Sequence, residues 1–501
     1  MQATAECSAT WHLTMKGFVG GSPVYRSRSR ARSPWFQHVT VAIGVTLVLL
    51  VSTQVRAQQT PPETSADAQN PADPPKPADP PKPEERDTGL PEQLKWKFNF
   101  DAAWGTFGFA NSFYVNNRPD PHGNLGDNWF EGYIKPALSV TLPLGKSELY
   151  GKVSAVGERT YGAPPTVVGE SASSFKQEDL YVGWRSGTSI GRSENLLDFT
   201  VGRAPYTIGH GFMLWDGAGE GGTRGGFWTN ARKAWRFAAL GRLKPGNHTI
   251  EGFYLERDDV PESDTGTRLT GVNYEYAAGK NSTFGATYIK AFAHRSVLRD
   301  RDGMNVLNAH AYTAPLPNLS DLSFEVEYAY EKNGSLMHST AYSALVAYQL
   351  SKVPWKPKFS YRYAFFEGDN PKTPEKESFD PLYVGFYDWG SWWQGEIAGE
   401  YFLSNSNNIS HQARVHFSPT DSLSWGVMGY WFHLPQPATF GSGATSTDVA
   451  FEFDAYLDWK IRKHFTVSLI GAFADPHRAV QQAYNRTNTF SYGMVYVAYS
   501  F

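Results

Sequence analysis

Hydrophobic and polar residues alternate along most of this chain with a period of two, the spacing that puts side chains on the two faces of a β-strand. The pattern begins at Leu94 and recurs in segments of about ten residues, with no helical period. In 448–460, for example, Phe451 and Phe453 occupy one face and Glu452 the other. A soluble β-sandwich would alternate in the same way with its apolar face inward, so alternation alone leaves the class open.

The lengths of the connections distinguish a sandwich from a membrane barrel. The tight turns are 143–146, 244–247, 278–281 and 419–421, and the long connections are 160–175, 205–230, 258–267, 293–303, 367–406, 435–447 and 475–489. Short turns on one side and long loops on the other are typical of outer-membrane β-barrels, whereas a sandwich has no reason to sort its loops. The chain also ends in a strand that stops on an aromatic residue, Phe501, as such barrels do.

These signals predict an all-β fold, a transmembrane antiparallel up-and-down β-barrel of about 18 strands over residues 94–501. The expected strands are 95–115, 127–142, 147–159, 176–186, 196–204, 231–243, 248–257, 268–277, 282–292, 304–313, 321–331, 338–350, 357–366, 407–418, 422–434, 449–460, 465–474 and 490–501. Residues 389–403 could add a nineteenth, but an odd count would put the termini on opposite sides of the membrane. We therefore assign 367–406 to one long extracellular loop, and whether it folds inward to narrow or gate the pore stays open. A barrel of roughly 16 to 18 strands leaves an aqueous channel.

The N-terminal part has a different composition. An apolar stretch at 39–51 follows a basic region and precedes small residues up to Ala57, which predicts a cleavable signal peptide at 1–57. An uncleaved anchor helix is the alternative, and Met15 is an alternative start. The only cysteine lies in the removed segment. Residues 58–93 contain 10 prolines and a near-perfect repeat, so we expect a disordered, extended periplasmic linker.

The face opposite the apolar one would line the channel, and charged residues there would meet a solute. The predicted pore-lining basic residues are Arg232, Arg236, Arg203, Arg362, Arg414, Lys135, Lys152 and Arg185. The predicted pore-lining acidic residues are Asp179, Glu325, Glu327, Glu452 and Asp454. Basic residues therefore weigh on the first half of the wall and acidic ones on the last strands, although the net charge of the chain is only -3. Such a split would set a transverse field across the channel and select anions where the pore is narrowest.

Arg232 and Arg236 carry the strongest hypothesis, because both fall on the lumen phase of 231–237 beside small residues. We expect their double substitution to alanine to lower anion preference. The alternative is that they pair with nearby carboxylates and only hold a loop. Arg203 shares the phase of the apolar Phe199 and Val201, so it faces the pore only if a bulge intervenes.

Several segments resemble the alginate export family of outer-membrane barrels. They are Val201-Gly202-Arg203 at a strand end, the Gly-rich loop Gly209 to Asp216, the following Arg232 to Arg236, and the later segments Phe379 to Tyr383 and Gly395 to Tyr401. The resemblance covers roughly residues 94–501 and implies a monomeric 18-stranded barrel whose basic constriction lets an anionic polysaccharide diffuse outward. A polyuronate carries one carboxylate per sugar, so exchangeable contacts with arginines and lysines would attract it without holding it tightly. The proline-rich linker is not something the resemblance requires, which leaves a general or substrate-specific porin for small organic anions as the alternative.

The expected partners are the lipid bilayer of a Gram-negative outer membrane and an anionic polysaccharide or small anions, with no nucleic acid. A periplasmic export scaffold docked on the turns stays open. No GxSxG, HExxH or paired-cysteine motif rises above chance, so we do not expect an enzyme. We expect no cofactor, although acidic residues near 258–264 and 300–303 could bind Ca²⁺ in extracellular loops if they are not simply solvated.

Overall fold

A computed structural model describes the chain from Leu94 to Phe501. Residues 114–125, 163, 165–170, 192, 216, 219–223, 261–263, 315–318, 386–393 and 442 are outside the described part. The predicted signal peptide (1–57) and linker (58–93) also lie outside it, so both stay predictions.

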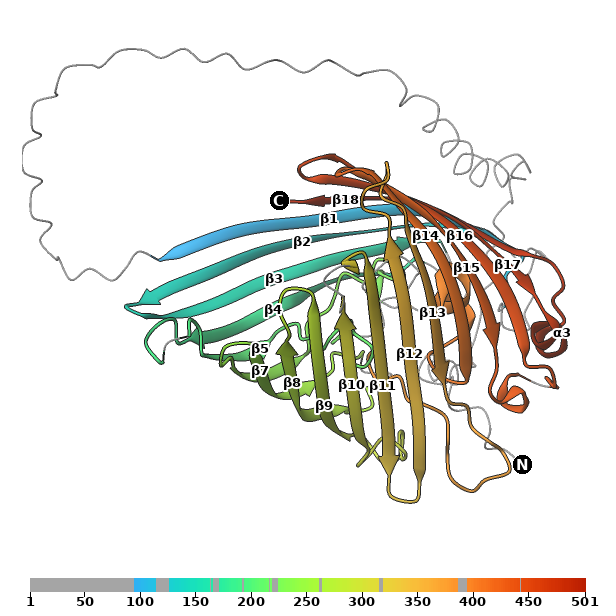
Figure 1. Cartoon of the computed structure of the whole chain (residues 1–501), viewed down its shortest axis with the longest axis horizontal. Coiled ribbons are helices and arrows are strands. Elements are labelled where there is room, and N and C mark those ends of the chain that lie inside the picture. Colours follow the sequence, from blue (N-terminus) through green and yellow to red (C-terminus); the bar gives the residue numbers. More distant parts are fainter. Residues whose placement is uncertain are drawn as a thin grey trace, which may run out of the picture.

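Eighteen β-strands form a single antiparallel sheet in which each strand pairs with its neighbours in the sequence (Figure 1). The strands are β1 (Lys95–Ala110), β2 (Asp127–Leu144), β3 (Ser147–Tyr161), β4 (Ser173–Arg185), β5 (Leu197–Arg203), β6 (Phe237–Leu243), β7 (His248–Glu256), β8 (Arg268–Ala277), β9 (Ser282–Phe292), β10 (Asn305–Thr313), β11 (Leu322–Asn333), β12 (Met337–Gln349), β13 (Lys358–Phe366), β14 (Asn408–Thr420), β15 (Leu423–His433), β16 (Asp448–Arg462), β17 (Phe465–Pro476) and β18 (Phe490–Ser500). Strand β1 also pairs with β18, so the sheet closes and leaves no free edge. The predicted all-β membrane barrel is therefore confirmed.

Two strand boundaries differ clearly from the sequence prediction. Strand β1 ends at Ala110 instead of 115, and β6 begins at Phe237 instead of 231. Residues 231–236 alternate like a strand but leave the wall and fold into the lumen, where they pair with Ala204, Pro205 and Gly217 of the same connection between β5 and β6. This second difference matters for function, because it removes Arg232 and Arg236 from the barrel wall.

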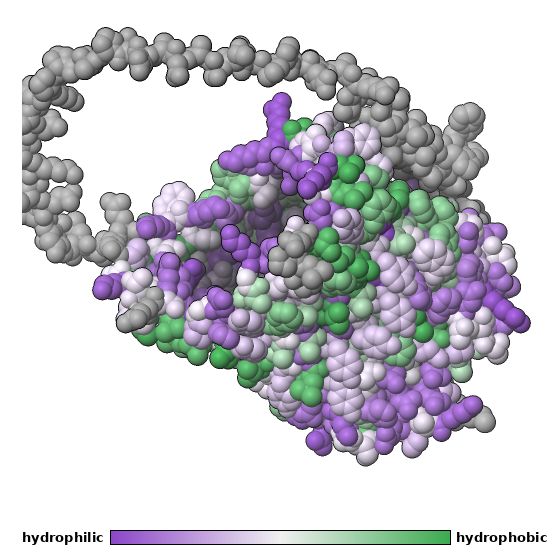
Figure 2. All heavy atoms as spheres, viewed as in Figure 1, coloured by the Kyte–Doolittle hydropathy of each residue, from purple (hydrophilic) through white to green (hydrophobic). Residues whose placement is uncertain are grey.

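The two faces of the wall have opposite character, as the alternation predicts. On β5, Phe199 and Val201 are exposed on the outside, whereas Asp198 and Thr200 are buried inside. Large exposed hydrophobic side chains recur all round the barrel, an arrangement that suits lipid rather than water. In the space-filling view, hydrophilic side chains border a hollow in the molecular surface (Figure 2).

The long loops do not simply project from the barrel, because two of them fold into its interior. Residues 204–214 pack in a buried hydrophobic cluster with Phe379, Leu382 and Tyr383 of the connection between β13 and β14. Leu214 and Tyr383 form a parallel β-bridge, which joins the two loops directly. The interior is thus partly filled by loops that come from different sides of the wall.

The same connection between β13 and β14 also contains a short π-helix, η3 (Gly395–Phe402), which packs against β16, β17 and β18. The predicted single loop at 367–406 is therefore one connection that folds inward. The other helices that lie wholly within the described residues are the single-turn η4 (Pro437–Thr439) and α3 (Arg478–Tyr484). No helix in the described residues has the length and apolar character needed to cross a membrane.

Candidate functional site

The inner segment, residues 224–236, lies against the lumen face of β2, β3 and β4. Three buried glutamates on these neighbouring strands accept hydrogen bonds from its backbone. Glu131 accepts from the N–H groups of Trp228 and Thr229 at 2.9 and 2.6 Å, Glu158 from Ala231 at 3.1 Å, and Glu178 from Lys233 and Ala234 at 2.6 and 2.8 Å. A carboxylate that accepts backbone N–H groups in a buried place makes strong bonds, so this glutamate ladder fixes the inner segment on the wall.

A β-bulge in β4 explains how two consecutive acidic residues both face the lumen. The register between β3 and β4 shifts between Val153 and Ala155, so that Glu178 and Asp179 both lie opposite Ser154. The Ser154 hydroxyl donates to Asp179 at 2.5 Å, and Lys152 Nζ lies 2.9 Å from the same carboxylate. Glu178 is left to bind the inner segment.

Three arginines converge on one carboxylate oxygen beside this ladder. Arg203 at the end of β5 and Arg224 and Arg232 of the inner segment all donate to Oδ2 of Asp258, with Arg224 Nη1 at 3.1 Å. Asp258 follows β7, and its own N–H binds the carbonyl oxygen of Gly217 at 2.8 Å. We call Arg203, Arg224, Arg232 and Asp258 the arginine cluster.

Arg203 reaches this cluster although it shares the phase of the lipid-facing Phe199 and Val201. Gly202 before it has φ = 125°, a conformation that other residues rarely adopt, and this breaks the alternation at the strand end. The β4–β5 register itself stays regular, so the turn of the chain and not an inserted residue redirects the side chain. The bulge that the sequence required is thus replaced by a glycine kink.

The cluster holds more positive than negative charge in direct contact. Among the described residues, the three guanidiniums have one ion-pair partner besides Asp258, namely Glu178, whose Oε2 lies 3.7 Å from Nε of Arg232. Burial by itself raises the pKa of the Asp258 carboxyl, but Arg203, Arg224 and Arg232 outweigh it and hold that pKa below its ordinary value. Asp258 is therefore ionised at neutral pH.

The other predicted basic residues occupy several different environments. Arg236 is 38% exposed and pairs with Asp264 at 3.0 Å, so it is not part of the cluster. Lys135 donates to the carbonyl oxygen of Ala231 at 3.1 Å, near Glu178. Arg185 lies over the ring of Tyr150 and pairs with Glu148 at 3.4 Å. Of the two arginines that we singled out from the sequence, the structure brings only Arg232 into the convergent group.

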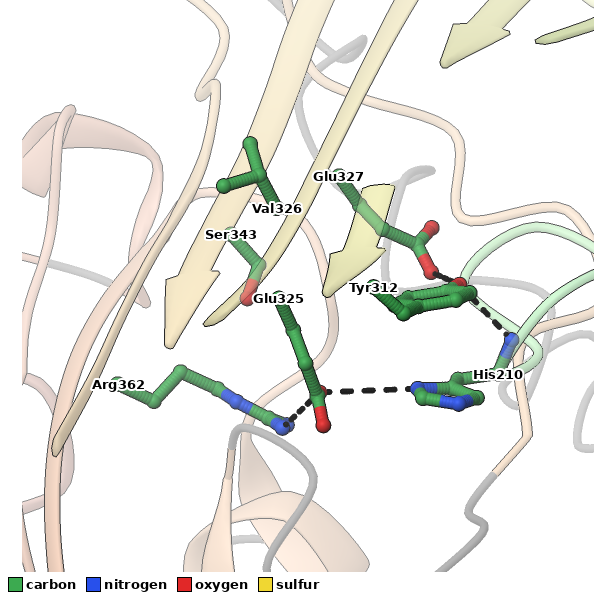
Figure 3. A pocket seen from close by; sticks show the side chains of 7 residues that line it. All are labelled: His210, Tyr312, Glu325, Val326, Glu327, Ser343 and Arg362. Carbon is green, nitrogen blue, oxygen red and sulfur yellow. Dashed lines mark hydrogen bonds and ion pairs between the residues drawn. The ribbon is translucent and has the colours of Figure 1, made fainter. Parts of the chain in front are cut away.

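A second polar group lies on the lumen face of β10 to β13 (Figure 3). The carboxylate of Glu325 lies between Arg362 Nη2 at 3.1 Å and His210 Nδ1 at 3.6 Å. The hydroxyl of Tyr312 donates to Glu327 and accepts from the N–H of His210 at 3.0 Å, and the rings of Tyr312 and His210 stack at 3.8 Å. The remaining cavity is about 10 Å³, enough for one water at most, so this group anchors the loop 204–236 and offers no room for a sugar.

Glu452 and Asp454 do not line an open pore, contrary to the sequence prediction. Both are fully buried under η3, where Glu452 accepts from the N–H groups of Ile397 and Ala398 at 2.7 and 2.8 Å. Asp454 accepts from the N–H of Glu396 at 3.2 Å. The acidic half of the expected transverse field is therefore partly used to hold a loop. Arg414, two strands away, donates to the hydroxyl of Tyr456 at 2.9 Å.

Sequence reasoning missed Arg224, Glu158 and Glu178 as members of the site and considered Asp258 only as a Ca²⁺ ligand. Three of these loop aspartates contact basic side chains: Asp258 contacts the arginine cluster, Asp264 contacts Arg236, and Asp300 contacts Lys376 at 2.9 Å. Ca²⁺ binding in these loops stays a prediction. Within the described residues, no group of three or more His, Cys, Asp or Glu side chains could hold a metal ion. The adjacent acidic pair at 178–179 was the available signal, since a regular strand cannot turn both inward.

Comparison with known proteins agrees with this geometry. The sequence pattern of a family described as alginate export matches residues 226–493 of the chain. The chain belongs to the alginate export family. The matched region begins inside the inner segment, includes η3 and the strands β6 to β17, and ends within β18. No curated protein matches the chain.

Solved structures share the fold of this alginate export family member at low sequence identity. A BenF-like porin from Pseudomonas fluorescens Pf-5 is 12% identical with a TM-score of 0.53, and covers 81% of this chain and 98% of its own. Pseudomonas aeruginosa OccK2 (OpdF) is 11% identical with a TM-score of 0.51, over 81% of this chain and 97% of its own. Family and fold together identify a channel of the Gram-negative outer membrane, embedded in lipid. Alginate export and porin-like barrels are transport proteins rather than enzymes.

Proposed function

We propose that this barrel lets an anionic polysaccharide of the alginate type cross the outer membrane passively through a basic constriction. The observation that carries the proposal is the arginine cluster, in which three guanidiniums, one from the end of β5 and two from the inner segment, meet on one carboxylate oxygen. In a member of the alginate export family, such a surplus of cations is suited to the carboxylates of a polyuronate.

Passage requires contacts that form and break easily. Lys135 on β2 and Lys152 on β3 are partly exposed beside the glutamate ladder, so they extend the basic surface along the wall. Each cation already has a carboxylate partner, which lowers the affinity for any single carboxylate of the polymer. A chain with one charge per sugar can then exchange from one cation to the next without being trapped.

A porin for small organic anions is the second candidate function. The described residues of the loops 204–236 and 367–407 fold inward and fill part of the lumen, which favours small solutes. Both candidates need the same basic residues, so only the size of the permeant solute separates them. The monomeric state and docking of a periplasmic export scaffold on the short turns stay predictions.

Electrical recording from the purified barrel in a planar bilayer tests the proposal. We expect anion selectivity in a KCl gradient and transient block of the current by oligomers of mannuronate or guluronate, but not by neutral dextran of the same size. The Arg232→Ala/Arg236→Ala double variant should show lower anion preference. Free passage of gluconate, with no effect of the uronate oligomers on the current, would favour the small-anion porin. Block of the current by dextran and polyuronate alike would exclude a path that selects by charge.

A further inference from the structure

The arginine cluster has unused hydrogen-bond capacity in a buried place. Each guanidinium carries five N–H donors, yet the three arginines converge on a single oxygen of Asp258. Nε of Arg203 and both Nε and Nη1 of Arg232 are buried and have no hydrogen-bond partner among the described residues. Buried polar groups are normally satisfied, so these donors indicate a place where an acceptor is missing.

The nearby carboxylates do not supply this acceptor. Oε1 of Glu158 binds the N–H of Ala231, and Oε1 of Glu178 binds two backbone N–H groups. Asp179 is paired with Lys152. The second oxygens, Oε2 of Glu158 and Oε2 of Glu178, are buried and hydrogen-bond no guanidinium, although Oε2 of Glu178 lies 3.7 Å from Nε of Arg232. Among the described residues, Asp258 is therefore the one whose carboxylate hydrogen-bonds all three guanidiniums.

We infer that the arginine cluster is a saturable binding site for a ligand carboxylate, and that Asp258 is an internal counter-ion that competes with the ligand for it. This inference rests on the proposed function and adds to it the residue that sets the affinity. Asp258 presents to the cluster the same group, a carboxylate, that a uronic acid would present.

Access to the cluster is compatible with such an exchange. The side chains of Arg203 and Asp258 are 15% and 12% exposed, so one side of the cluster is open, while Arg232 behind them is almost fully buried. A rotation of the Asp258 side chain would leave Arg203 and Arg224 to a planar, bidentate carboxylate. Arg232, still held by Glu178, would then keep the site positive without leaving the inner segment.

Competition makes a prediction that simple attraction does not. Removing the negative charge of Asp258 should strengthen ligand binding, because the ligand no longer displaces an ion pair. We expect Asp258→Asn to lower the glucuronate concentration that halves the chloride current by about tenfold. The matched control is Asp264→Asn, which removes an acidic residue that pairs with Arg236 outside the cluster, and it should leave this concentration nearly unchanged.

A second variant keeps the inference testable if Asp258→Asn does not insert as a barrel. Arg203→Ala removes the most exposed guanidinium of the cluster and should weaken block by glucuronate, whereas Arg236→Ala should not. Inorganic phosphate at the same charge distinguishes a carboxylate site from a general oxyanion site, since tighter phosphate block would overturn the assignment to a carboxylate. Unchanged block by glucuronate in Asp258→Asn would also overturn the inference. If Asp258→Asn does not insert, unchanged block by glucuronate in Arg203→Ala would overturn it.

The outcome is separable from that of the proposed function. If Asp258→Asn binds glucuronate more tightly but polyuronate never blocks the wild-type barrel, the carboxylate site stands and polysaccharide export fails. If polyuronate blocks the wild type and Asp258→Asn changes nothing, export stands and the role given to Asp258 is wrong.

Discussion

The carboxylate of Glu452 on β16 accepts the backbone N–H of Ile397 at 2.7 Å and so fixes the start of η3 on the barrel wall. The same side chain accepts from Ala398 through its other oxygen, at 2.8 Å. The glutamate ladder on β2 to β4 binds the inner segment in the same manner. Two loops from opposite parts of the chain are therefore held inside the lumen by buried carboxylates that accept from backbone N–H groups.

Glu452→Gln should release η3 from the wall. An amide offers one oxygen instead of two and turns an N–H donor toward a backbone N–H. The contact between residue 452 and η3 should therefore lose about 1.5–3 kcal/mol of stabilising free energy. We expect faster cleavage of the loop 367–407 by protease in the folded barrel and a larger, noisier conductance. Asp458→Asn is the control, because Asp458 lies on the same strand and accepts from Ser468 instead of η3. If the loop in Glu452→Gln resists protease as well as in the wild type, Glu452 does not hold η3 on the wall.

Gly395→Ala tests the same contact between Glu452 and η3 by steric means. Gly395 has φ = 73°, and an added Cβ would lie 2.5 Å from Oε1 of Glu452. Gly279 has φ = 75° with open space around the Cβ position, so Gly279→Ala carries the same backbone strain without the clash. Strain alone costs about 1 kcal/mol. We expect Gly395→Ala to lower the temperature at which the loop 367–407 becomes open to protease clearly more than Gly279→Ala does. Equal effects of the two substitutions would mean that the Glu452 contact is irrelevant.

The wall was predictable from the sequence because lipid imposes alternation on every strand. Segments such as Asp448–Arg462 must place apolar residues outward and can place charged ones inward, and this leaves a strong pattern. Residues 231–236 show where that logic stops. They alternate as well, but their partners are backbone-binding glutamates on β2 to β4, and such an interaction has no side-chain pattern of its own.

The roles of the charged residues were less predictable than their inward orientation. Alternation places Asp179 and Glu452 inside the barrel, but it does not tell whether a loop covers them. The β-bulge opposite Ser154 and the kink at Gly202 each redirect one functional side chain, Glu178 and Arg203. Both depend on local backbone geometry, which the alternation of hydrophobic and polar residues along a strand does not reveal.

The charge of Asp258 gives the channel a defined pH dependence. Its pKa in the folded protein lies below the ordinary value of 3.8, so its ion pairs are complete above that value and are lost as the pH falls through the lower, folded pKa. We expect wild type and Asp258→Asn to differ in anion selectivity from pH 7 down to about 4, with Asp258→Asn more selective, and to converge at lower pH where the wild-type carboxyl is protonated. Reversal potentials in a KCl gradient measure this. A difference that vanishes already at pH 6 would mean that another group controls selectivity.

Arg301 joins the connection between β9 and β10 to the inward loop. Its Nε and Nη2 bind the two oxygens of Asp380 at 2.6 and 2.5 Å, and Nη1 donates to the hydroxyl of Tyr383, the residue that bridges to Leu214. Burial raises the pKa of Asp380, but Arg301 outweighs it and holds that pKa below its ordinary value. The pair is therefore ionised and nearly closed to water.

Arg301→Met should leave the Asp380 carboxylate without its cation and destabilise the joined loops by about 3–5 kcal/mol. Because Tyr383 pairs with residues 213–215, the change should reach the loop 204–236 as well, and both loops should become accessible to protease while the strands stay protected. Arg295→Met is the matched control: Arg295 is 88% exposed and pairs with Asp302 in solvent, so its loss should have little effect. Cleavage confined to the loop 367–407 would show that the two inward loops move independently and that the Leu214–Tyr383 bridge does not couple them.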